Sequence, residues 1–496
     1  MTAELDLDLR KIRIAPAALS MVNDAIARRH KLLPVALRGD EEAPELIVAF
    51  RNHEGLTHEE RLESVLAILE SIEDRHGIGV IPYFVEDVET FDKIHRRIYP
   101  DRRTDTAIGS EVLLNELVSM ALIQRASDIH IDSGEEGGSV GFRIDGKMKP
   151  IRKLAFRELE ELTAVIKLQA NLDIAERRTP MDGAITLDLA GEEISLRLAT
   201  IPTLNGEHLT LRLLASSNTE DLLQLDNLCF CPQHLEVLKA SLAEPGGIIV
   251  VSGPTGSGKT TTLYAALRHL RDLGGRHIIS LEDPVEMPLA GVTQVKIDED
   301  GERVTFHKAL RSVLRHDPDV VLIGEIRDRE TADIAVRASL TGHLVLSTLH
   351  TNDALGVVTR LLDLGVPEYL LASTLRLVMA QRLVRRPSPH GLSWTPATET
   401  ERIYMGCKND DEAPLPRPQG SEFDGGTGYT GRAAIYEIVP MNTRLRTMIA
   451  GRESEEALAK FAFGELGCHT LRTDGIAKAR EGLTTLAEVR AVAGGI

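Results

Sequence analysis

Residues 253–260 read GPTGSGKT, directly after the apolar stretch IIVVS and directly before TTLYAALRHL, which has helical periodicity. This is the pattern G-x-x-x-x-G-K-[ST] placed between a strand and a helix. The glycines let backbone N–H groups face phosphate oxygens, and the N-terminus of the following helix adds partial positive charge. The segment therefore predicts a nucleotide site and an α/β fold in which a parallel strand leads through this turn into a helix.

Two side chains of the segment have separate electrostatic tasks. Lys259 is expected to contact the β- and γ-phosphate oxygens, and Thr260 is expected to ligate Mg²⁺. The cofactors implied are ATP and Mg²⁺. The full set of predicted nucleotide-binding residues is Gly253, Pro254, Thr255, Gly256, Ser257, Gly258, Lys259, Thr260 and Thr261.

Hydrolysis needs a carboxylate that positions and activates water, and two segments supply candidates. In VVLIGEIRD an apolar strand delivers Glu325 to the carboxyl edge of the sheet, where open α/β folds bind their ligands, so Glu325 is the candidate base. In LEDPVE the acids Glu282, Asp283 and Glu286 follow the strand HIISL and are expected near Mg²⁺ or its waters. The predicted Mg²⁺ ligands, partly through water, are Thr260, Asp283 and Glu325.

A third polar segment, TGHLVLSTLHTND, places His343 before and His350 after an apolar strand. An imidazole there is expected to sense the γ-phosphate or a neighbouring subunit. A plain structural role for each histidine stays open at this point.

Composition limits the alternatives. The net charge of −18 disfavours a protein that tracks along DNA, because it repels the phosphate backbone. The N-terminus lacks the apolar core of a signal peptide, and the longest aliphatic runs are strand-sized, so a cytoplasmic protein is expected that meets a membrane only through partners. The four cysteines do not form two CxxC pairs, so no zinc is expected.

The length of 496 residues predicts several domains. Periodicity indicates a small α/β domain over residues 1–100, with strands at Leu33–Leu37 and Leu46–Phe50, and a second α/β domain over residues 107–217. Alternating strands and helices over 218–386 predict a parallel sheet with flanking helices. Residues 387–496 form a C-terminal region that begins with irregular chain to residue 431 and ends in helices.

Four ordered segments resemble the assembly ATPases of type II secretion and type IV pili. GPTGSGKTTTLY resembles the Walker A segment of that family, ISLEDPVE its Asp box, LRHDPDVVLIGEIRD its Walker B and TGHLVLSTLHTND its His box. The resemblance implies a RecA-like P-loop NTPase core, preceded by a PAS-like α/β domain and a small N-terminal α/β domain.

The second domain also resembles the family, through ASDIHID, FRIDG, AERRTPMDG and ISLRLATIPTLNGEHLTLRLL. The resemblance implies that Arg197 and Arg212 reach the nucleotide phosphates, where arginine neutralises developing charge; Arg143 has a weaker match. Many members carry two CxxC pairs after the segment that resembles AQRLVRR, whereas this chain reads VRRPSPHG, so the metal-binding module is degenerate and the zinc ligands are missing.

The resemblance implies a homohexameric motor that hydrolyses ATP to power assembly of a type IV pilus or a type II secretion pseudopilus at the inner membrane. The implied partners are an inner-membrane platform protein and a cytoplasmic adaptor, met through residues 14–100, although cyclic-dinucleotide binding by that domain stays open. The alternatives are a DNA-uptake or conjugation motor of the same superfamily and a nucleotide-binding regulator without hydrolysis.

Overall fold

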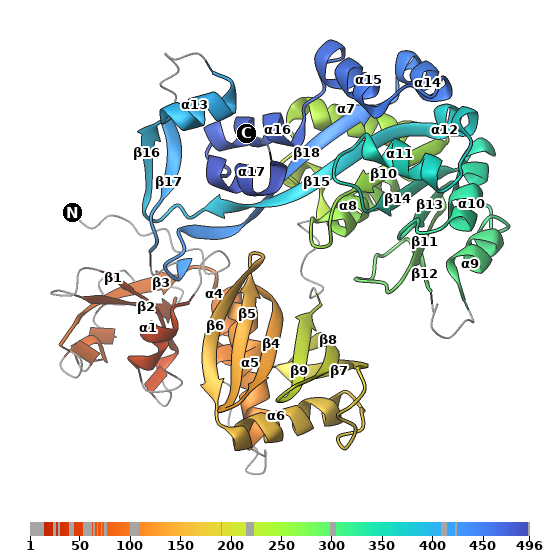
Figure 1. The fold of residues 1–496 in the computed structure, drawn as a ribbon. Helices are drawn as coiled ribbons and strands as arrows, with labels where there is room; N and C mark the ends of the chain where they lie inside the picture. Colours follow the sequence, from red (N-terminus) through yellow and green to blue (C-terminus); the bar gives the residue numbers. More distant parts are fainter. Residues whose placement is uncertain are drawn as a thin grey trace. The chain divides into compact units, whose positions relative to one another are not determined.

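The computed structural model describes residues 14–22, 26–27, 30–38, 44–52, 62, 65–66, 68–70, 72–73, 77–99, 109–189, 191–214, 223–297, 304–407, 414–421 and 424–494. The chain divides into two compact units (Figure 1). Unit 1 comprises residues 1–216, 388–392 and 418–430, and unit 2 comprises residues 217–387, 393–417 and 431–496. Each unit is described by itself.

Unit 2 is built on a seven-stranded sheet with the order β12-β11-β13-β14-β10-β15-β18. The strands from β12 to β15 in this order run parallel. Their bounds are β10 (Gly247–Ser252), β11 (Ile278–Glu282), β12 (Thr293–Lys296), β13 (Val320–Ile323), β14 (Leu344–Leu349), β15 (Leu375–Pro387) and β18 (Tyr429–Pro440).

Helices cover both faces of this sheet, which explains why its central strands β13, β14 and β10 are buried along their whole length. Alternate residues of β10 enter different cores: Ile248 and Val250 join one cluster, and Ile249 and Val251 join the other. The first cluster includes α9 (Phe306–Val313), α10 (Arg329–Leu340), α11 (Gly356–Asp363) and α12 (Glu368–Thr374), and the second includes α7 (Pro232–Ala243) and α8 (Lys259–Leu273).

The C-terminal helices of unit 2 follow β18, which is the last strand of the chain. They are α14 (Thr443–Ala450), α15 (Glu455–Ala459), the π-helical turn η4 (Lys460–Glu465), α16 (Leu471–Arg480) and α17 (Leu486–Ala493). A 3₁₀ turn, η2 (Leu225–Asn227), precedes α7.

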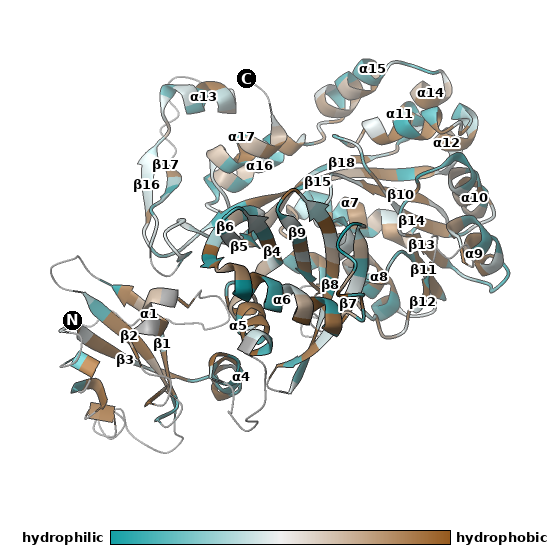
Figure 2. Cartoon of the chain, turned by 60° about the horizontal axis from the view of Figure 1, so that its bottom comes forward, coloured by the Kyte–Doolittle hydropathy of each residue, from teal (hydrophilic) through white to brown (hydrophobic). Residues whose placement is uncertain are grey.

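Unit 1 contains a six-stranded antiparallel sheet with the order β6-β5-β4-β9-β8-β7. The bounds are α5 (Gly109–Ile123), β4 (Ala126–Gly134), β5 (Gly137–Ile144), β6 (Lys147–Leu154), α6 (Phe156–Gln169), β7 (Met181–Leu189), β8 (Glu192–Thr203) and β9 (Gly206–Leu213). Burial alternates along β8, so one face packs on α5 and α6 and the other bears exposed side chains. Figure 2 shows the hydrophobic stretches of α5 that form part of this core.

A second sheet of unit 1 has the order β1-β2-β3 and belongs to the N-terminal α/β region. The elements are α1 (Pro16–Ser20), β1 (Leu32–Arg38), β2 (Glu45–Arg51), β3 (Gly79–Val85) and α4 (Val88–Ile98). Strands β1 and β2 confirm the strands predicted at Leu33–Leu37 and Leu46–Phe50.

The expectation of irregular chain over residues 387–431 is wrong for much of that segment. The structure places β16 (Leu392–Pro396), α13 (Glu399–Met405) and β17 (Pro414–Pro418) there, and β16 pairs with β17. A capping box between Thr398 and Glu401 begins α13 despite the Pro-rich and acidic composition around it.

Candidate active site

The loop between β10 and α8 has the backbone that a phosphate cradle requires. Gly253 has φ 147° and Gly258 has φ 88°, both in a region that side chains rarely adopt. A Cβ on Gly253 would lie 2.6 Å from the carbonyl oxygen of Gln381 and 2.7 Å from Oγ of Ser257. Glycine is therefore required at 253 both by conformation and by close packing against β15.

Lys259 begins α8 and its side chain lies against the same loop. Its Nζ donates hydrogen bonds to the carbonyl oxygens of Gly253 at 2.7 Å and Pro254 at 3.1 Å. Burial lowers the pKa of Lys259, while the charge of Glu325 opposes that change. Lys259 and Glu325, which are 66 positions apart in the sequence, therefore belong to one electrostatic site.

Glu325 follows β13 and is partly buried, as the predicted base should be. Its Oε1 lies 3.6 Å from Nε2 of His350, and its Oε2 accepts a hydrogen bond from Nε of Arg327 at 2.8 Å. The neighbouring strand fixes the chain just before it, because Thr348 Oγ1 donates to the carbonyl oxygen of Gly324 at 2.7 Å. The sheet thus brings Glu325 and His350 together, with the phosphate loop on the next strand but one.

Glu282 ends β11 and is buried, with 4% of its surface exposed. Its carboxylate accepts hydrogen bonds from the hydroxyls of Tyr264 and Ser280 and from Nε2 of Gln294 at 3.1 Å. Three donors from the protein already hydrogen-bond to this buried carboxylate, so it is not available to act on water. We therefore interpret Glu282 as a positioning residue, although the sequence placed it among the catalytic acids.

Asp283 and Glu286, in contrast, are exposed in the turn that follows β11. The backbone N–H of Glu286 donates to the Tyr264 hydroxyl at 3.3 Å, so the turn is tied to α8. Strand β11 lies three strand spacings, about 14 Å, from β10 in the sheet order. The predicted role of Asp283 as a Mg²⁺ ligand acting partly through water stays a prediction.

The two histidines of the third segment lie at opposite ends of β14. His350 follows Leu349, on the same edge as the phosphate loop, whereas His343 precedes Leu344. The Nδ1 of His343 lies 2.8 Å from the carbonyl oxygen of Ala338. Because the six-residue strand spans about 20 Å, the structure does not bring His343 to the phosphate edge of its own unit. Of the two roles predicted for His343, contact with a neighbouring subunit is therefore the one that stays a prediction.

The predicted arginines form a row across the six-stranded sheet of unit 1. Arg143, Asp128, Arg212 and Arg197 are successive cross-strand partners on β5, β4, β9 and β8, so they share one face. Arg212 Nε donates to Asp128 Oδ1 at 2.9 Å, and Arg143 Nε lies 3.8 Å from Oδ2. Although burial opposes it, hydrogen bonds from Arg212 and Ser127 lower the pKa of Asp128. With three arginines and one aspartate, the row carries a net positive charge, which attracts anions.

Two residues of β15 that the sequence analysis did not select also lie against the phosphate loop. Gln381 is buried and accepts a hydrogen bond from Thr262 Oγ1 at 2.8 Å through its Oε1. Arg382 donates from Nη2 to the carbonyl oxygen of Asn352 at 2.6 Å, and its charge acts on Lys259. Only the parallel pairing of β15 with β10 reveals them, because nothing in the sequence AQRLVRR fixes that register.

Comparisons with known sequences identify relatives of this chain. The model of a family described as type II/IV secretion system protein matches residues 103–491. The type II secretion system protein E of Aeromonas hydrophila is 43% identical over 379 residues, which cover 76% of this chain and 74% of that protein. The type IV pilus assembly ATPase PilB of Myxococcus xanthus is 37% identical over 509 aligned residues, which cover 97% of this chain and 88% of that protein.

Solved structures share the fold. The ATPase DotB of Legionella pneumophila has a TM-score of 0.57 at 21% identity, covering 80% of this chain and 98% of that chain. The pilus retraction motor PilT with bound ADP has a TM-score of 0.51 at 26% identity, covering 77% of this chain and 96% of that chain. These likenesses confirm the predicted α/β fold with a RecA-like core.

Proposed function

The chain belongs to the type II/IV secretion system protein family, whose members are ATPases, and from this membership we propose a specific motor function. The protein hydrolyses Mg²⁺-bound ATP to drive assembly of a type IV pilus or a type II secretion pseudopilus. The observation that carries the proposal is the common strand edge at which the phosphate loop, Glu325 and His350 meet.

Each side chain at this edge has a task in phosphoryl transfer. The Lys259 amine, which already points into the loop, exchanges its two carbonyl acceptors for β- and γ-phosphate oxygens. Glu325 accepts a proton from the attacking water or orients it, and His350 holds the Glu325 carboxylate in place. The Thr260 hydroxyl would hold Mg²⁺, with Asp283 and Glu325 acting partly through water, and the bound ion would supply charge neutralisation at the phosphates.

Unit 1 supplies positive charge in this proposal. The roles of Arg197 and Arg212 at the nucleotide are supported by their cross-strand pairing on an exposed sheet face. Arginine stabilises the charge that develops on a transferred phosphoryl group. Arg212 already pairs with Asp128, so its guanidinium is held in a defined direction.

We further propose that six copies form a ring in the cytoplasm. A head-to-tail interface that closes by rotation makes such a ring, and a loop or domain movement in each copy converts hydrolysis into motion. The ring meets an inner-membrane platform protein and a cytoplasmic adaptor through the N-terminal domain. Among the described residues, no helix is long and apolar enough to cross a bilayer.

Assembly is favoured over retraction by how much of the chain each relative covers. The pilus assembly relative aligns with 97% of this chain, whereas the retraction motor aligns with 77% of it. The alignment with the retraction motor leaves the rest of this chain unmatched, whereas the alignment with the pilus assembly relative includes nearly all of it. A region used for docking on an assembly platform would account for that difference.

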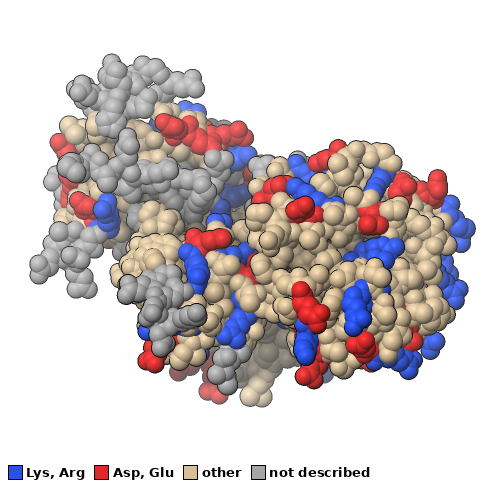
Figure 3. All heavy atoms as spheres, turned by 90° about the horizontal axis from the view of Figure 1, so that it is seen from above, with Lys and Arg blue, Asp and Glu red and all other residues tan. Residues whose placement is uncertain are grey.

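Two other functions make different predictions. A DNA motor needs a basic track and binds DNA in a salt-dependent way, whereas Figure 3 shows acidic and basic side chains intermixed on the face displayed. A nucleotide-binding regulator would bind ATP without turnover, and the position of Glu325 beside His350 argues against it.

The proposal is tested by steady-state ATP turnover together with light scattering on a sizing column, with and without nucleotide. Wild type should turn over Mg²⁺-ATP and form a hexamer that nucleotide favours, and Lys259→Ala should lose both nucleotide binding and turnover. Tight ATP binding without turnover in a stable hexamer would support the regulator instead. Turnover that duplex DNA stimulates, and that 0.5 M salt abolishes, would support the DNA motor.

A further inference from the structure

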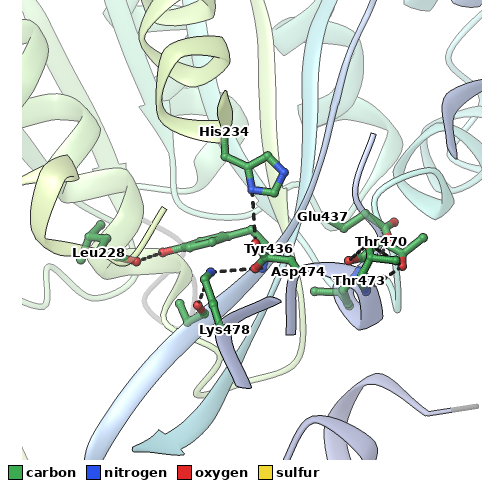
Figure 4. Close-up of polar contacts among 10 residues, drawn as sticks. Leu228, His234, Tyr436, Glu437, Thr470, Thr473, Asp474 and Lys478 are labelled. Atoms are coloured by element: carbon green, nitrogen blue, oxygen red, sulfur yellow. Dashed lines mark hydrogen bonds and ion pairs between the residues drawn. The ribbon is translucent and has the colours of Figure 1, made fainter. Parts of the chain in front are cut away.

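Four metal-ligand side chains converge in unit 2 at a place that the proposed motor chemistry does not use. Cys231 is the N-cap of α7 and His234 lies in the first turn of that helix. His469 precedes Thr470, the N-cap of α16, and Asp474 lies in the first turn of α16. One ligand atom from each of the four lies within 4.8 Å of the others. Figure 4 shows His234 pointing down onto Asp474.

Unsatisfied polar atoms distinguish this cluster from ordinary buried polar groups. His234 is 6% exposed, and its Nδ1 has no hydrogen-bond partner among the described residues. The Nδ1 of His469 is likewise buried without a partner in the part of the chain that the structure describes. A buried ring nitrogen that makes no hydrogen bond carries an uncompensated desolvation cost, which a bound ion would remove.

Asp474 presents one carboxylate oxygen to the histidines. Its Oδ2 accepts hydrogen bonds from Nζ of Lys478 at 2.7 Å and from the backbone N–H of Tyr436 at 2.8 Å. Its Oδ1 lies 3.7 Å from Nδ1 of His234, which is too long for a hydrogen bond but is a usual separation for two ligands of one ion.

We propose that Cys231, His234, His469 and Asp474 bind one divalent transition-metal ion of the zinc class. One thiolate, two imidazoles and one carboxylate are ligands that zinc accepts in a tetrahedral site. With bonds of about 2.0–2.3 Å, the ligand atoms of such a tetrahedron lie about 3.3–3.8 Å apart. The cluster reaches this geometry by closing about 1 Å, which side-chain rotations supply.

The charges around the cluster accommodate a divalent ion. A thiolate and the Asp474 carboxylate bring two negative charges to the ion, although the carboxylate also pairs with the Lys478 amine. The neighbouring Lys478 amine is held on the other carboxylate oxygen and over the Tyr436 ring, 4.7 Å from its centroid, and it also donates to the carbonyl oxygen of Ala434 at 2.8 Å. Lys478 is therefore kept from the side of the carboxylate on which the ion binds.

An ion here would join two distant segments of unit 2. Helix α7 leads into β10 and the phosphate loop, whereas α16 is one of the last helices of the chain. Two ligands come from each helix start, so the ion links the C-terminal helices to the motor core. No zinc was expected because the cysteines do not form CxxC pairs. The proposed ligands are instead a mixed set of Cys, His and Asp side chains from two segments separated by more than two hundred residues.

Cobalt titration tests the site directly, because Co²⁺ replaces zinc and reports its ligands by absorption. Protein treated with chelator and freed of nucleotide should bind one Co²⁺ per chain. The expected spectrum has the intense visible bands of a tetrahedral ion and a thiolate-to-cobalt charge-transfer band in the near ultraviolet. Zn²⁺ should abolish both bands and should raise the thermal midpoint of unfolding.

Variants of the partly buried ligands show whether these residues form the site. Cys231→Ser should remove the charge-transfer band, and Cys231→Ser and His469→Ala should each weaken Co²⁺ binding by at least about tenfold. Cys229→Ser, two positions away, is the matched control and should keep wild-type binding. Equal metal-free melting temperatures of the three variants and wild type would show that all of them fold. Octahedral Co²⁺ without a thiolate band in wild type, or unchanged binding in Cys231→Ser, would overturn the proposal.

Discussion

The hydroxyl of Tyr264 is the structural link between the helix that starts at the phosphate loop and the acidic turn after β11. It donates a hydrogen bond to Oε2 of the buried Glu282 and accepts one from the backbone N–H of Glu286. Burial, and then the adjacent Glu282 carboxylate, raise the pKa of Tyr264 far above its usual range, so the hydroxyl stays protonated. Tyr264→Phe removes both hydrogen bonds and leaves the ring in its place.

The expected cost follows from the charge of the acceptor. A hydrogen bond to a charged group contributes about 1.5–3 kcal/mol, and Glu282 keeps its other donors, Ser280 and Gln294. For a unit of this size, each kcal/mol lowers the melting temperature by about 2–4 °C, so Tyr264→Phe should lower it by about 3–12 °C. Because the turn that holds Asp283 loses its anchor, kcat for ATP should fall while ADP affinity changes less than about twofold.

Differential scanning calorimetry and steady-state turnover measure the two effects on the same samples. Tyr369→Phe is the matched control, since that side chain is 66% exposed and the substitution should change neither quantity. A difference of about 1 °C is close to the smallest change in melting temperature that can be resolved. If the melting temperatures of Tyr264→Phe and Tyr369→Phe differ by no more than that, the assignment of Glu282 as a buried positioning residue is wrong. A loss of ADP affinity as large as the loss of kcat would place Tyr264 in nucleotide binding instead.

Three further perturbations have defined outcomes. Gly253→Ala should weaken binding of a fluorescent ADP analogue by about tenfold or more, because a strained loop conformation costs about 1–3 kcal/mol; binding within twofold of wild type would contradict this. Hydrogen bonds from Arg417 lower the pKa of Glu401 to about 2, so the stabilisation by this pair is complete above the ordinary carboxyl pKa and is lost as pH falls toward 2. The urea midpoint, reported by the fluorescence of the one tryptophan, Trp394, should therefore fall more steeply between about pH 5 and 3 in wild type than in Glu401→Gln; equal slopes would contradict this. Lys167 and Glu207 form a buried ion pair, so Lys167→Met should lower the free energy of unfolding of unit 1 by about 3–5 kcal/mol in chemical denaturation. Adding Glu207→Gln should restore part of that loss, and a double variant that is no more stable than Lys167→Met would refute the pairing argument.

Much of the motor core could be predicted because its signals are local. The strand, glycine turn and helix around Lys259 occupy consecutive residues, and the apolar run before Glu325 marks a strand that ends at an acid. In a parallel sheet such strand ends meet at one edge, so the proximity of Glu325 to His350 follows from pattern alone. His343 shows the limit of that reasoning, because a residue before a strand lies at the other edge.

The remaining features depend on contacts between segments far apart in the sequence. Glu282 is one of three acids in the segment LEDPVE, and only the three donors to its buried carboxylate distinguish it from Asp283 and Glu286. The cluster of Cys231 and His469 depends on two helix starts meeting in the fold, which no spacing rule contains. Helix α13 was not predicted, because the segment around it is rich in proline and acidic residues even though Thr398 supplies a capping signal.

The central claim is that Glu325 performs chemistry at a nucleotide held by the phosphate loop. Its most direct test compares ATP binding with ATP turnover in Glu325→Gln, using Glu330→Gln as the control, since Glu330 is an exposed acid on α10 that pairs with Arg311. We predict that Glu325→Gln binds Mg²⁺-ATP as wild type does but loses turnover by about 100-fold or more, whereas Glu330→Gln retains both. Turnover in Glu325→Gln within a few-fold of wild type would contradict the account.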